Sequence, residues 1–385
     1  MESMGILNKT FKGIYKGKKV LVTGHTGFKG SWLCIWLREL GAEVVGYSLD
    51  PPSIPSNFEA CNLKSKITHI HGDIRDLAHL QIVFKEYTPE VVFHLAAQPL
   101  VRLSYEEPKL TFDTNVGGTV NVLEAIRLTP SVRVFINVTS DKCYENREWV
   151  WGYREQDPMG GHDPYSASKG CAELVFAAYQ RSFFTNKSSE ERKIGVASVR
   201  AGNAIGGGDW GIDRIIPDCV RALTKSESIV LRHPKAIRPW QHVLEPLSGY
   251  LWLGALLLEN KDKYSGAWNF GPLNDAIQTV QKVVENFIKL WGNGRWIDIS
   301  TNKSDCVHEA TLLKLCCDKA HAYLNWWTCL ALADALQHTV QWYKEYYQSN
   351  FSPDMYPICV TQIQEYTLAA QKQGLIWAEC EKKQI

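Results

Sequence analysis

Short apolar runs rich in β-branched residues recur along the first two thirds of the chain, and stretches of helical periodicity separate them. The first run, residues 19–24 (KVLVTG), predicts a buried parallel strand that ends in glycine. Residues 30–40 predict a helix, because the large apolar side chains between Trp32 and Leu40 fall on one face. The further strand-like runs are residues 42–49, 67–73, 90–98, 132–140 and 193–203. This alternation predicts an α/β fold, a doubly wound parallel sheet of the Rossmann type.

The pattern changes after residue 205. Glycine and proline become frequent, as in GGGDWGIDRIIPD and RHPKAIRPWQHV, and long parallel strands no longer occur. We therefore expect a smaller, mixed α/β C-terminal lobe that binds substrate. The expected division is a Rossmann domain of residues 14–205 plus 238–272, a substrate lobe of residues 206–237 plus 273–345, and a C-terminal extension of residues 346–385.

Composition narrows the class of protein. A net charge of +1 gives no basic field, so we expect no nucleic acid partner. No apolar run reaches the roughly 18 residues that span a bilayer, and the first residues lack the apolar core of a secretory signal. Residues 249–258 are apolar but short, and predict a buried helix. Eleven scattered cysteines without a CxxC pair favour reduced thiols in the cytoplasm and no metal centre.

Three glycines indicate a dinucleotide site. Gly24, Gly27 and Gly30 lie in TGHTGFKG, between a predicted strand and a predicted helix. The first permits the tight turn, the second lets the backbone approach a pyrophosphate, and the third allows close packing of helix on strand. The helix N-terminus attracts the anion. The spacing alone is weak evidence, but its place between strand and helix is what the motif requires.

Asp50 ends the second predicted strand, 20 residues after Gly30. A carboxylate there accepts hydrogen bonds from adenosine ribose hydroxyls and repels a 2′-phosphate, which favours NAD over NADP. The alternative is a turn aspartate before two prolines. The other residues expected to bind cofactor are Thr26, Phe28 and Lys29 in the glycine turn, Asp73 and Ile74 after the third strand, Ala96, Ala97 and Gln98 after the fourth, and Asn115.

Two groups of residues predict catalytic chemistry. Tyr165 and Lys169 form a YxxxK pair, which a helix places on one face. An ammonium beside a phenol lowers the phenol pKa toward working pH, so we expect Tyr165 to take a hydroxyl proton. Ser140, Asp141 and Lys142 follow the fifth strand, and strand carboxyl ends are where α/β sheets place ligand chemistry. The alternative for Tyr165 and Lys169 is an ordinary surface helix, and the alternative for residues 140–142 is a polar turn after a strand.

Several strings together resemble the extended short-chain dehydrogenase/reductase family. They are TGHTGFKG, HGDIRD, HLAAQ, TSDKCY, YSASK, VRAGN and RPWQHV, in the family's order. Longer strings, such as TSDKCYENREWVWGYRE and VRAGNAIGGGDW, resemble the nucleotide-sugar 4,6-dehydratases that act on CDP-glucose. The resemblance implies bound NAD, CDP-glucose as substrate, and a homodimer or homotetramer paired through two long helices, one of them carrying Tyr165.

The resemblance also implies roles. Tyr165, helped by Ser140 and Lys169, would deprotonate the glucose C4 hydroxyl, and Asp141 would protonate the leaving C6 oxygen. Related dehydratases usually carry glutamate where this chain has Lys142. Lys142 therefore removes the C5 proton, or it stays charged and stabilises the enolate. Rival readings are an epimerase or decarboxylase of the same fold, and a non-catalytic NAD-binding scaffold.

The expected substrate contacts lie in both lobes. Arg238 resembles the family arginine that clamps the nucleotide pyrophosphate, and a guanidinium fork fits phosphate oxygens. Arg214 is a second candidate for that role. Asn203 is expected to hold the diphosphate or its loop. The remaining candidates are Gln98, Arg102, Ser140 and Glu309.

Overall fold

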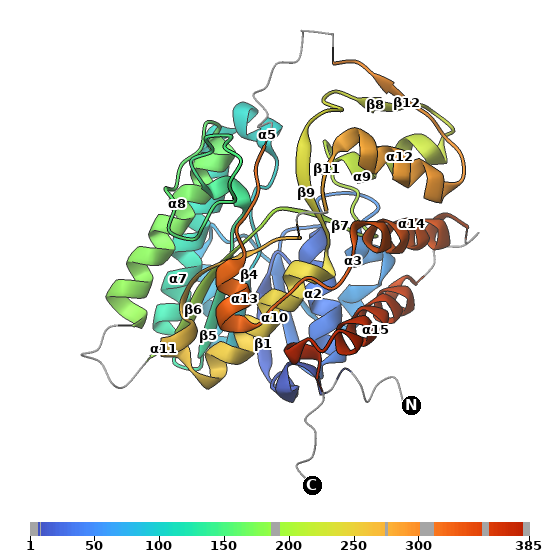
Figure 1. Cartoon of the computed structure of the whole chain (residues 1–385). Helices are drawn as coiled ribbons and strands as arrows, with labels where there is room; N and C mark the ends of the chain where they lie inside the picture. Colours follow the sequence, from blue (N-terminus) through green and yellow to red (C-terminus); the bar gives the residue numbers. More distant parts are fainter. Residues whose placement is uncertain are drawn as a thin grey trace.

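The computed structural model describes residue 7 and residues 9–185, 193–273, 276–300, 312–348 and 354–379. At its centre is a seven-stranded sheet in the order β10-β6-β5-β4-β1-β2-β3, whose neighbouring strands all run parallel (Figure 1). Its strands are β1 (Lys19–Thr23), β2 (Glu43–Ser48), β3 (Thr68–His71), β4 (Val91–His94), β5 (Val134–Val138), β6 (Gly195–Ala201) and β10 (Gly266–Phe270).

Two apolar layers sandwich this sheet, because successive side chains of a strand point to opposite faces. Val20 and Val22 of β1 pack into one layer and Leu21 packs into the other. Every residue of β4, β5 and β6 is buried, which is why these strands occur in the sequence as continuous apolar runs. The predicted α/β fold with a doubly wound parallel sheet is confirmed.

Helices on each face of the sheet supply the rest of the two layers (Figure 1). One layer contains α2 (Phe28–Glu39), α10 (Leu244–Glu259) and α15 (Tyr356–Lys372). The other contains α4 (Leu77–Tyr87), α7 (Gly118–Leu128) and α8 (Pro164–Tyr179). Shorter helices connect these elements: α3 (Asn57–Ala60), α5 (Val101–Glu106), α6 (Pro108–Phe112), α11 (Lys261–Tyr264) and α13 (Asp318–Leu324).

A smaller group of elements lies above the carboxyl ends of the sheet (Figure 1). It contains a three-stranded sheet, a two-stranded sheet and three helices. These are β7 (Asn203–Ile205), β9 (Ile237–His242), β11 (Ile277–Thr279), β8 (Ile229–Leu231), β12 (Trp296–Asp298), α9 (Ile215–Thr224), α12 (Val280–Trp291) and α14 (Leu332–Gln348). We expected residues 238–272 to return to the large sheet. Within this segment β10 joins the large sheet and α10 packs against it, whereas β9 pairs with β7 and β11 instead.

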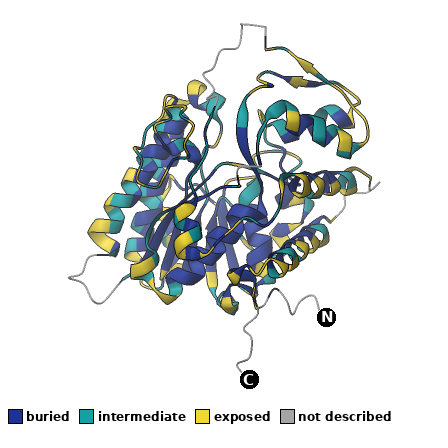
Figure 2. Cartoon of the chain, in the orientation of Figure 1, coloured by how far each residue is buried: buried dark blue, intermediate teal, exposed yellow. Residues whose placement is uncertain are grey.

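The C-terminal region closes one face of the core. Helix α15 packs on α2 and has buried positions along its length (Figure 2). Trp377 beyond it is fully buried. The Trp377 ring stacks on Phe11 with ring centroids 5.1 Å apart. The apolar residues 249–258 lie in α10, a buried helix as predicted. Across the described residues we find no helix whose length and apolar character would let it cross a bilayer.

Candidate active site

A cavity of about 830 Å³ lies at the carboxyl ends of the sheet strands and extends beneath the smaller group of elements. Nearly all of the predicted site residues line it. The exceptions are Asn115 and Arg102, which lie outside the lining, and Glu309, which lies outside the described residues. The described residues contain no group of three or more His, Cys, Asp or Glu side chains that could hold a metal ion.

The glycine turn forms one end of the cavity. Gly24 has φ of +73°, and a Cβ there would lie 2.6 Å from the Ala96 backbone nitrogen. A Cβ on Gly30 would collide with the Gly24 carbonyl oxygen. Both positions therefore need glycine, one for the turn and the other for packing of α2 on β1. Because α2 begins at Phe28, its N-terminus faces the cavity and suits a pyrophosphate.

Side chains beyond the turn fit the adenosine part of a dinucleotide. The Asp50 side chain is 86% exposed, with its carboxylate 3.7 Å from His71 Nε2, and it is open to ribose hydroxyls. The Asp73 carboxylate instead accepts from Arg75 Nε at 2.9 Å. This hydrogen bond lowers the Asp73 pKa. The residues present therefore fit a dinucleotide cofactor.

Asn115 and Gln98, both predicted to contact the cofactor, make hydrogen bonds within the wall of the cavity. Asn115 accepts from the Gln98 backbone nitrogen at 2.8 Å and donates to Ser168 Oγ on α8 at 2.8 Å. The Gln98 side chain donates to Thr111 Oγ1 at 2.8 Å and to the Leu100 carbonyl at 3.0 Å. Asn115 thus lies behind the wall, contrary to its predicted contact with cofactor, and it fixes the turn after β4 against α8.

The catalytic candidates converge from two elements. Asp163 caps α8 by accepting from the Ser166 backbone nitrogen, and Pro164 occupies the first turn, so the helix begins just before Tyr165. Tyr165 and Lys169 are 7% and 6% exposed and line the cavity. Ser140 precedes a single helical turn and donates to Asp141 Oδ1 at 3.0 Å.

Burial controls the protonation of Tyr165 and Lys169. Loss of solvation raises the pKa of Tyr165 to about 12, and a hydrogen bond with Ser140 opposes this rise. In this structure the Tyr165 pKa therefore lies above its ordinary value, opposite to the predicted direction, because burial disfavours the charged phenolate. Burial, reinforced by the neighbouring Lys29 ammonium, lowers the pKa of Lys169 to about 8.

Asp141 has the properties of a proton donor. Its side chain is buried, and desolvation raises its pKa above the ordinary value. Lys142, Lys29 and Arg238 oppose that rise through their charges. Lys142 lines the cavity beside Asp141, so a carboxyl and an ammonium reach the same space.

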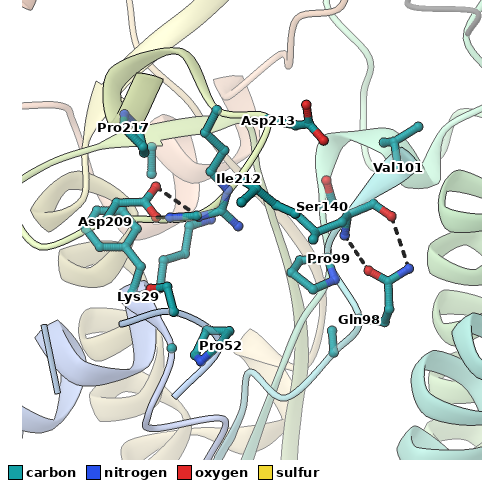
Figure 3. A pocket seen from close by; sticks show the side chains of 18 of the residues that line it. Lys29, Pro52, Gln98, Pro99, Val101, Ser140, Asp209, Ile212, Asp213 and Pro217 are labelled. Carbon is teal, nitrogen blue, oxygen red and sulfur yellow. Dashed lines mark hydrogen bonds and ion pairs between the residues drawn. The ribbon is translucent and has the colours of Figure 1, made fainter. Parts of the chain in front are cut away.

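Charged residues from the loop after β7 lie opposite this cluster. Arg214 Nη1 donates to both Asp209 oxygens, at 3.0 and 2.9 Å (Figure 3). Asp213 lies 3.7 Å from Arg102 Nε and accepts from Arg232 at 3.0 Å. Arg102 thus pairs with Asp213 near the cavity instead of lining it. Sequence reasoning missed these aspartates, although acidic residues beside Arg214 in GGGDWGIDR were a signal of charge pairing.

The remaining substrate candidates, Arg238 and Asn203, lie on neighbouring strands of the three-stranded sheet. Arg238 is buried in β9, donates to the Ile237 carbonyl at 2.8 Å and lines the cavity. Asn203 begins β7 and also lines it. With Lys29 and Arg214, Arg238 gives this part of the cavity several cationic groups, which suits a diphosphate.

Comparison with known proteins gives a family match, a close sequence relative and several similar structures. The model of the GDP-mannose 4,6 dehydratase family matches residues 21–289. A CDP-glucose 4,6-dehydratase from Salmonella typhimurium is 49% identical over 94% of this chain and 99% of its own length. An epimerase structure from Methanothermobacter thermautotrophicus superposes with a TM-score of 0.74 and 23% identity, covering 90% of this chain and 97% of that one. A dTDP-glucose 4,6-dehydratase from Bacillus anthracis, in complex with NAD, gives a TM-score of 0.69 and 23% identity, covering 86% of this chain and 98% of that one.

Fold and cavity together define a Rossmann-fold enzyme of the extended short-chain dehydrogenase/reductase class. Within that class the chain belongs to the GDP-mannose 4,6 dehydratase family, since the family model matches more than half of it. The family predicted from the sequence strings is confirmed by this match and by the Salmonella relative.

Proposed function

We propose that this enzyme is a CDP-glucose 4,6-dehydratase, which converts CDP-D-glucose to CDP-4-keto-6-deoxy-D-glucose and water. The observation that carries the proposal is the 49% identity to the Salmonella CDP-glucose 4,6-dehydratase over nearly the full length of both chains. The cavity supports it, because Tyr165, Asp141 and Lys142 line one space. Together these side chains provide a base for the C4 hydroxyl, an acid for the C6 oxygen and a group for C5.

The cofactor in this proposal is NAD. Its pyrophosphate would lie on the glycine turn and the N-terminus of α2, and its adenosine ribose would lie beside Asp50. The chemistry that NAD supplies when bound is removal of a hydride from the sugar C4 and its return to C6. Lys169 would hold the nicotinamide ribose, and the short side chains of Ala96 and Ala97 allow close approach of the backbone.

The first step belongs to Tyr165. Its phenolate takes the C4 hydroxyl proton, and Ser140 hydrogen-bonds the same hydroxyl. Because burial holds the phenol pKa at about 12, positive charge beside it must help it lose its proton. Lys169 on the same helix face and Arg214 across the cavity are the cations that would do so.

Elimination follows at the next carbons. The 4-ketone acidifies the C5 proton, and Asp141 protonates the C6 oxygen as it leaves as water. Burial raises the Asp141 pKa, which favours the protonated acid that this step needs. Lys142 removes the C5 proton in this proposal. Its rival role, a fixed cation that stabilises the enolate, is distinguished by the pH profile of C5 exchange, since only a base shows its own ionisation there.

The nucleotide diphosphate would lie among the cationic groups. Arg238 clamps the pyrophosphate and Arg214 assists, while Asn203 holds the diphosphate or its loop. Gln98, which lines the cavity, would also lie on the substrate side. Arg214 belongs to the proposed substrate lobe of residues 206–237 plus 273–345, whereas Arg238 and Asn203 come from the proposed NAD-binding domain of residues 14–205 plus 238–272.

We propose a homodimer or homotetramer, in which subunits pair through α7 and α8. Large apolar side chains lie exposed along these two helices. They include Leu128, Leu174 and, in the turn after α8, Phe183. Packing the same face of a second copy would cover them.

The test mixes the purified protein with CDP-glucose in heavy water and follows the sugar by NMR. The expected result is a 4-keto-6-deoxy sugar with deuterium at C5. Parallel samples with dTDP-glucose and GDP-mannose test which nucleotide sugar the enzyme accepts. A sugar that changes only its C4 configuration would establish a 4-epimerase instead, and no turnover of any of the three substrates would leave a cofactor-binding scaffold.

A further inference from the structure

A buried ion pair joins the catalytic helix to the strands behind it. Glu173 lies on α8, one helical turn beyond Lys169, and is 4% exposed. It accepts from Arg200 Nε at 2.9 Å and from Arg200 Nη2 at 2.8 Å. It also accepts from Ser198 Oγ at 2.7 Å and from Thr139 Oγ1. One carboxylate on α8 therefore fixes β6 and the residue that immediately precedes Ser140.

The other edge of the Arg200 guanidinium reaches the segment after Asp141. Arg200 Nη1 donates to the Tyr144 hydroxyl at 2.6 Å and to the Glu155 carbonyl at 2.9 Å. The guanidinium also lies over the Tyr144 ring, 4.9 Å from its centroid. The pair therefore links α8 and β6 to Thr139, which precedes Ser140, and to Tyr144 and Glu155 in the segment that follows Asp141 and Lys142.

Such a pair contributes little net stability, because desolvation of two charges offsets their attraction. Neither Glu173 nor Arg200 lines the cavity, so neither touches substrate or cofactor. Their contacts instead suit a role in fixing the position of α8 on the sheet. A helix can slide along a sheet over apolar side chains, whereas a carboxylate with four directed hydrogen bonds fixes both its position and its rotation.

We propose that Glu173 and Arg200 are positioning residues, which lock α8 against the carboxyl end of β5 so that Tyr165 and Lys169 face Ser140 and Asp141. This inference rests on the proposed function of those four side chains. It assigns to the pair an effect on kcat, with KM unchanged, because misplacement of a reacting group by about 1 Å can cost roughly a hundredfold in rate.

The pair also acts on the charge of Lys169. The groups that act electrostatically on its ammonium are Lys29 from α2, His94 from β4, Cys143 from the turn after β5, and Glu173 on its own helix. Burial and Lys29 lower the Lys169 pKa, and Glu173 raises it. Loss of the Glu173 charge should therefore let Lys169 lose its proton at a lower pH.

The main test compares Glu173→Gln with Glu245→Gln. Glu245 is an equally buried carboxylate on α10, which accepts from the Cys329 and Leu330 backbone nitrogens and from the Tyr366 hydroxyl, away from the cavity. With CDP-glucose as probe, Glu173→Gln should lower kcat about 10- to 100-fold at unchanged KM, and move the alkaline limb of the rate profile to lower pH. Glu245→Gln should keep the wild-type kcat and limb. The inference fails if the two variants behave alike.

Glu173→Gln leaves the Arg200 charge without a counterion and could lower the rate by misfolding. A second variant separates that effect from loss of positioning. The double change Glu173→Leu with Arg200→Met removes both charges and keeps apolar volume, an exchange that buried ion pairs often tolerate. We expect it to melt near the wild-type temperature with the same loss of kcat. A folded double variant with wild-type kcat and pH profile would overturn the inference. Wild-type turnover measured alongside separates that failure from failure of the proposed function.

Discussion

At the catalytic cluster, buried cations and carboxyls share one low-dielectric space. Desolvation lowers the pKa of Lys29 and of Lys169 to about 8, and it raises the pKa of Asp141. In water these three groups would all be charged at neutral pH. In the cavity a pKa of about 8 brings both lysines close to the point of changing protonation, and the upward shift of the Asp141 pKa favours its protonated form, as proton transfer during turnover requires.

This electrostatic arrangement predicts the alkaline limb of the pH profile. Lys169 works as a cation, and its pKa of about 8 means that the ammonium is lost as pH rises through that value. We expect kcat/KM to fall above about pH 8, and Lys29→Met to move this limb to higher pH, because the neighbouring ammonium that lowers the Lys169 pKa is gone. Initial rates over neutral to alkaline pH provide the measurement. A limb that stays in place in Lys29→Met would contradict the assignment.

Lys142 allows a second prediction. Lys142→Met keeps the stem of the side chain and removes its charge and its basicity. Whether Lys142 is the C5 base or a cation beside the enolate, the reaction should stall after C4 oxidation, with dehydration reduced about 100-fold or more. Rapid quench and NMR should show the 4-keto hexose accumulating, and formation of the 6-deoxy product at the wild-type rate would rule Lys142 out of both roles.

The candidate catalytic residues that the sequence predicts line one cavity. Each of them could be found from a local motif, namely a glycine turn, a YxxxK spacing or a strand end. It did less well where a role depends on tertiary contacts. Gln98 occurs in HLAAQ, one of the strings typical of the family, yet its amide group and that of Asn115 bond within the cavity wall. The Glu173–Arg200 pair joins residues 27 positions apart, so spacing on one element does not reveal it.

At the scale of elements, the C-terminal region contributes more to the core than its sequence suggests. The sequence after residue 348 has few apolar signals, because α15 faces the core with tyrosine, glutamine and threonine as well as isoleucine. Some of these buried polar side chains bond within the core, as where the Tyr366 hydroxyl donates to Glu245 Oε2 at 2.8 Å. The cysteine-rich stretch near residues 316–329 also packs on α10 and does not line the cavity.

Trp377→Ala tests this contribution to stability. The Trp377 ring is fully buried against Phe11, Trp36 and Tyr366, so truncation should leave a cavity and cost about 3–5 kcal/mol of unfolding free energy. Urea denaturation gives the value. Activity at low temperature should persist, since Trp377 does not line the active-site cavity. A loss below about 1 kcal/mol would mean that the tail is not part of the cooperative core.

At the scale of the whole molecule, the outer faces of α7 and α8 carry exposed apolar side chains, away from the active-site cavity. Figure 2 shows exposed and intermediate positions along the outer side of α8. The inner faces of α7 and α8 pack on the sheet, so only their outer faces are available to another subunit.

Leu174→Glu tests the proposed pairing. Leu174 lies on α8 with 60% of its surface exposed, and a carboxylate there would have to be buried unpaired at the interface. We expect sedimentation to show a shift toward the monomer. Ile82→Glu is the matched control, since Ile82 is 61% exposed on α4, outside the proposed pair of helices. Equal effects of the two changes, or none, would contradict pairing through α7 and α8.

The central claim is that one chain carries a sugar through oxidation at C4, loss of water and reduction at C6. CDP-glucose deuterated at C4 tests it in a single measurement. We expect product with the deuterium at C6, and no such product from Tyr165→Phe. Deuterium that remains at C4 in the product, or unchanged transfer in Tyr165→Phe, would contradict it.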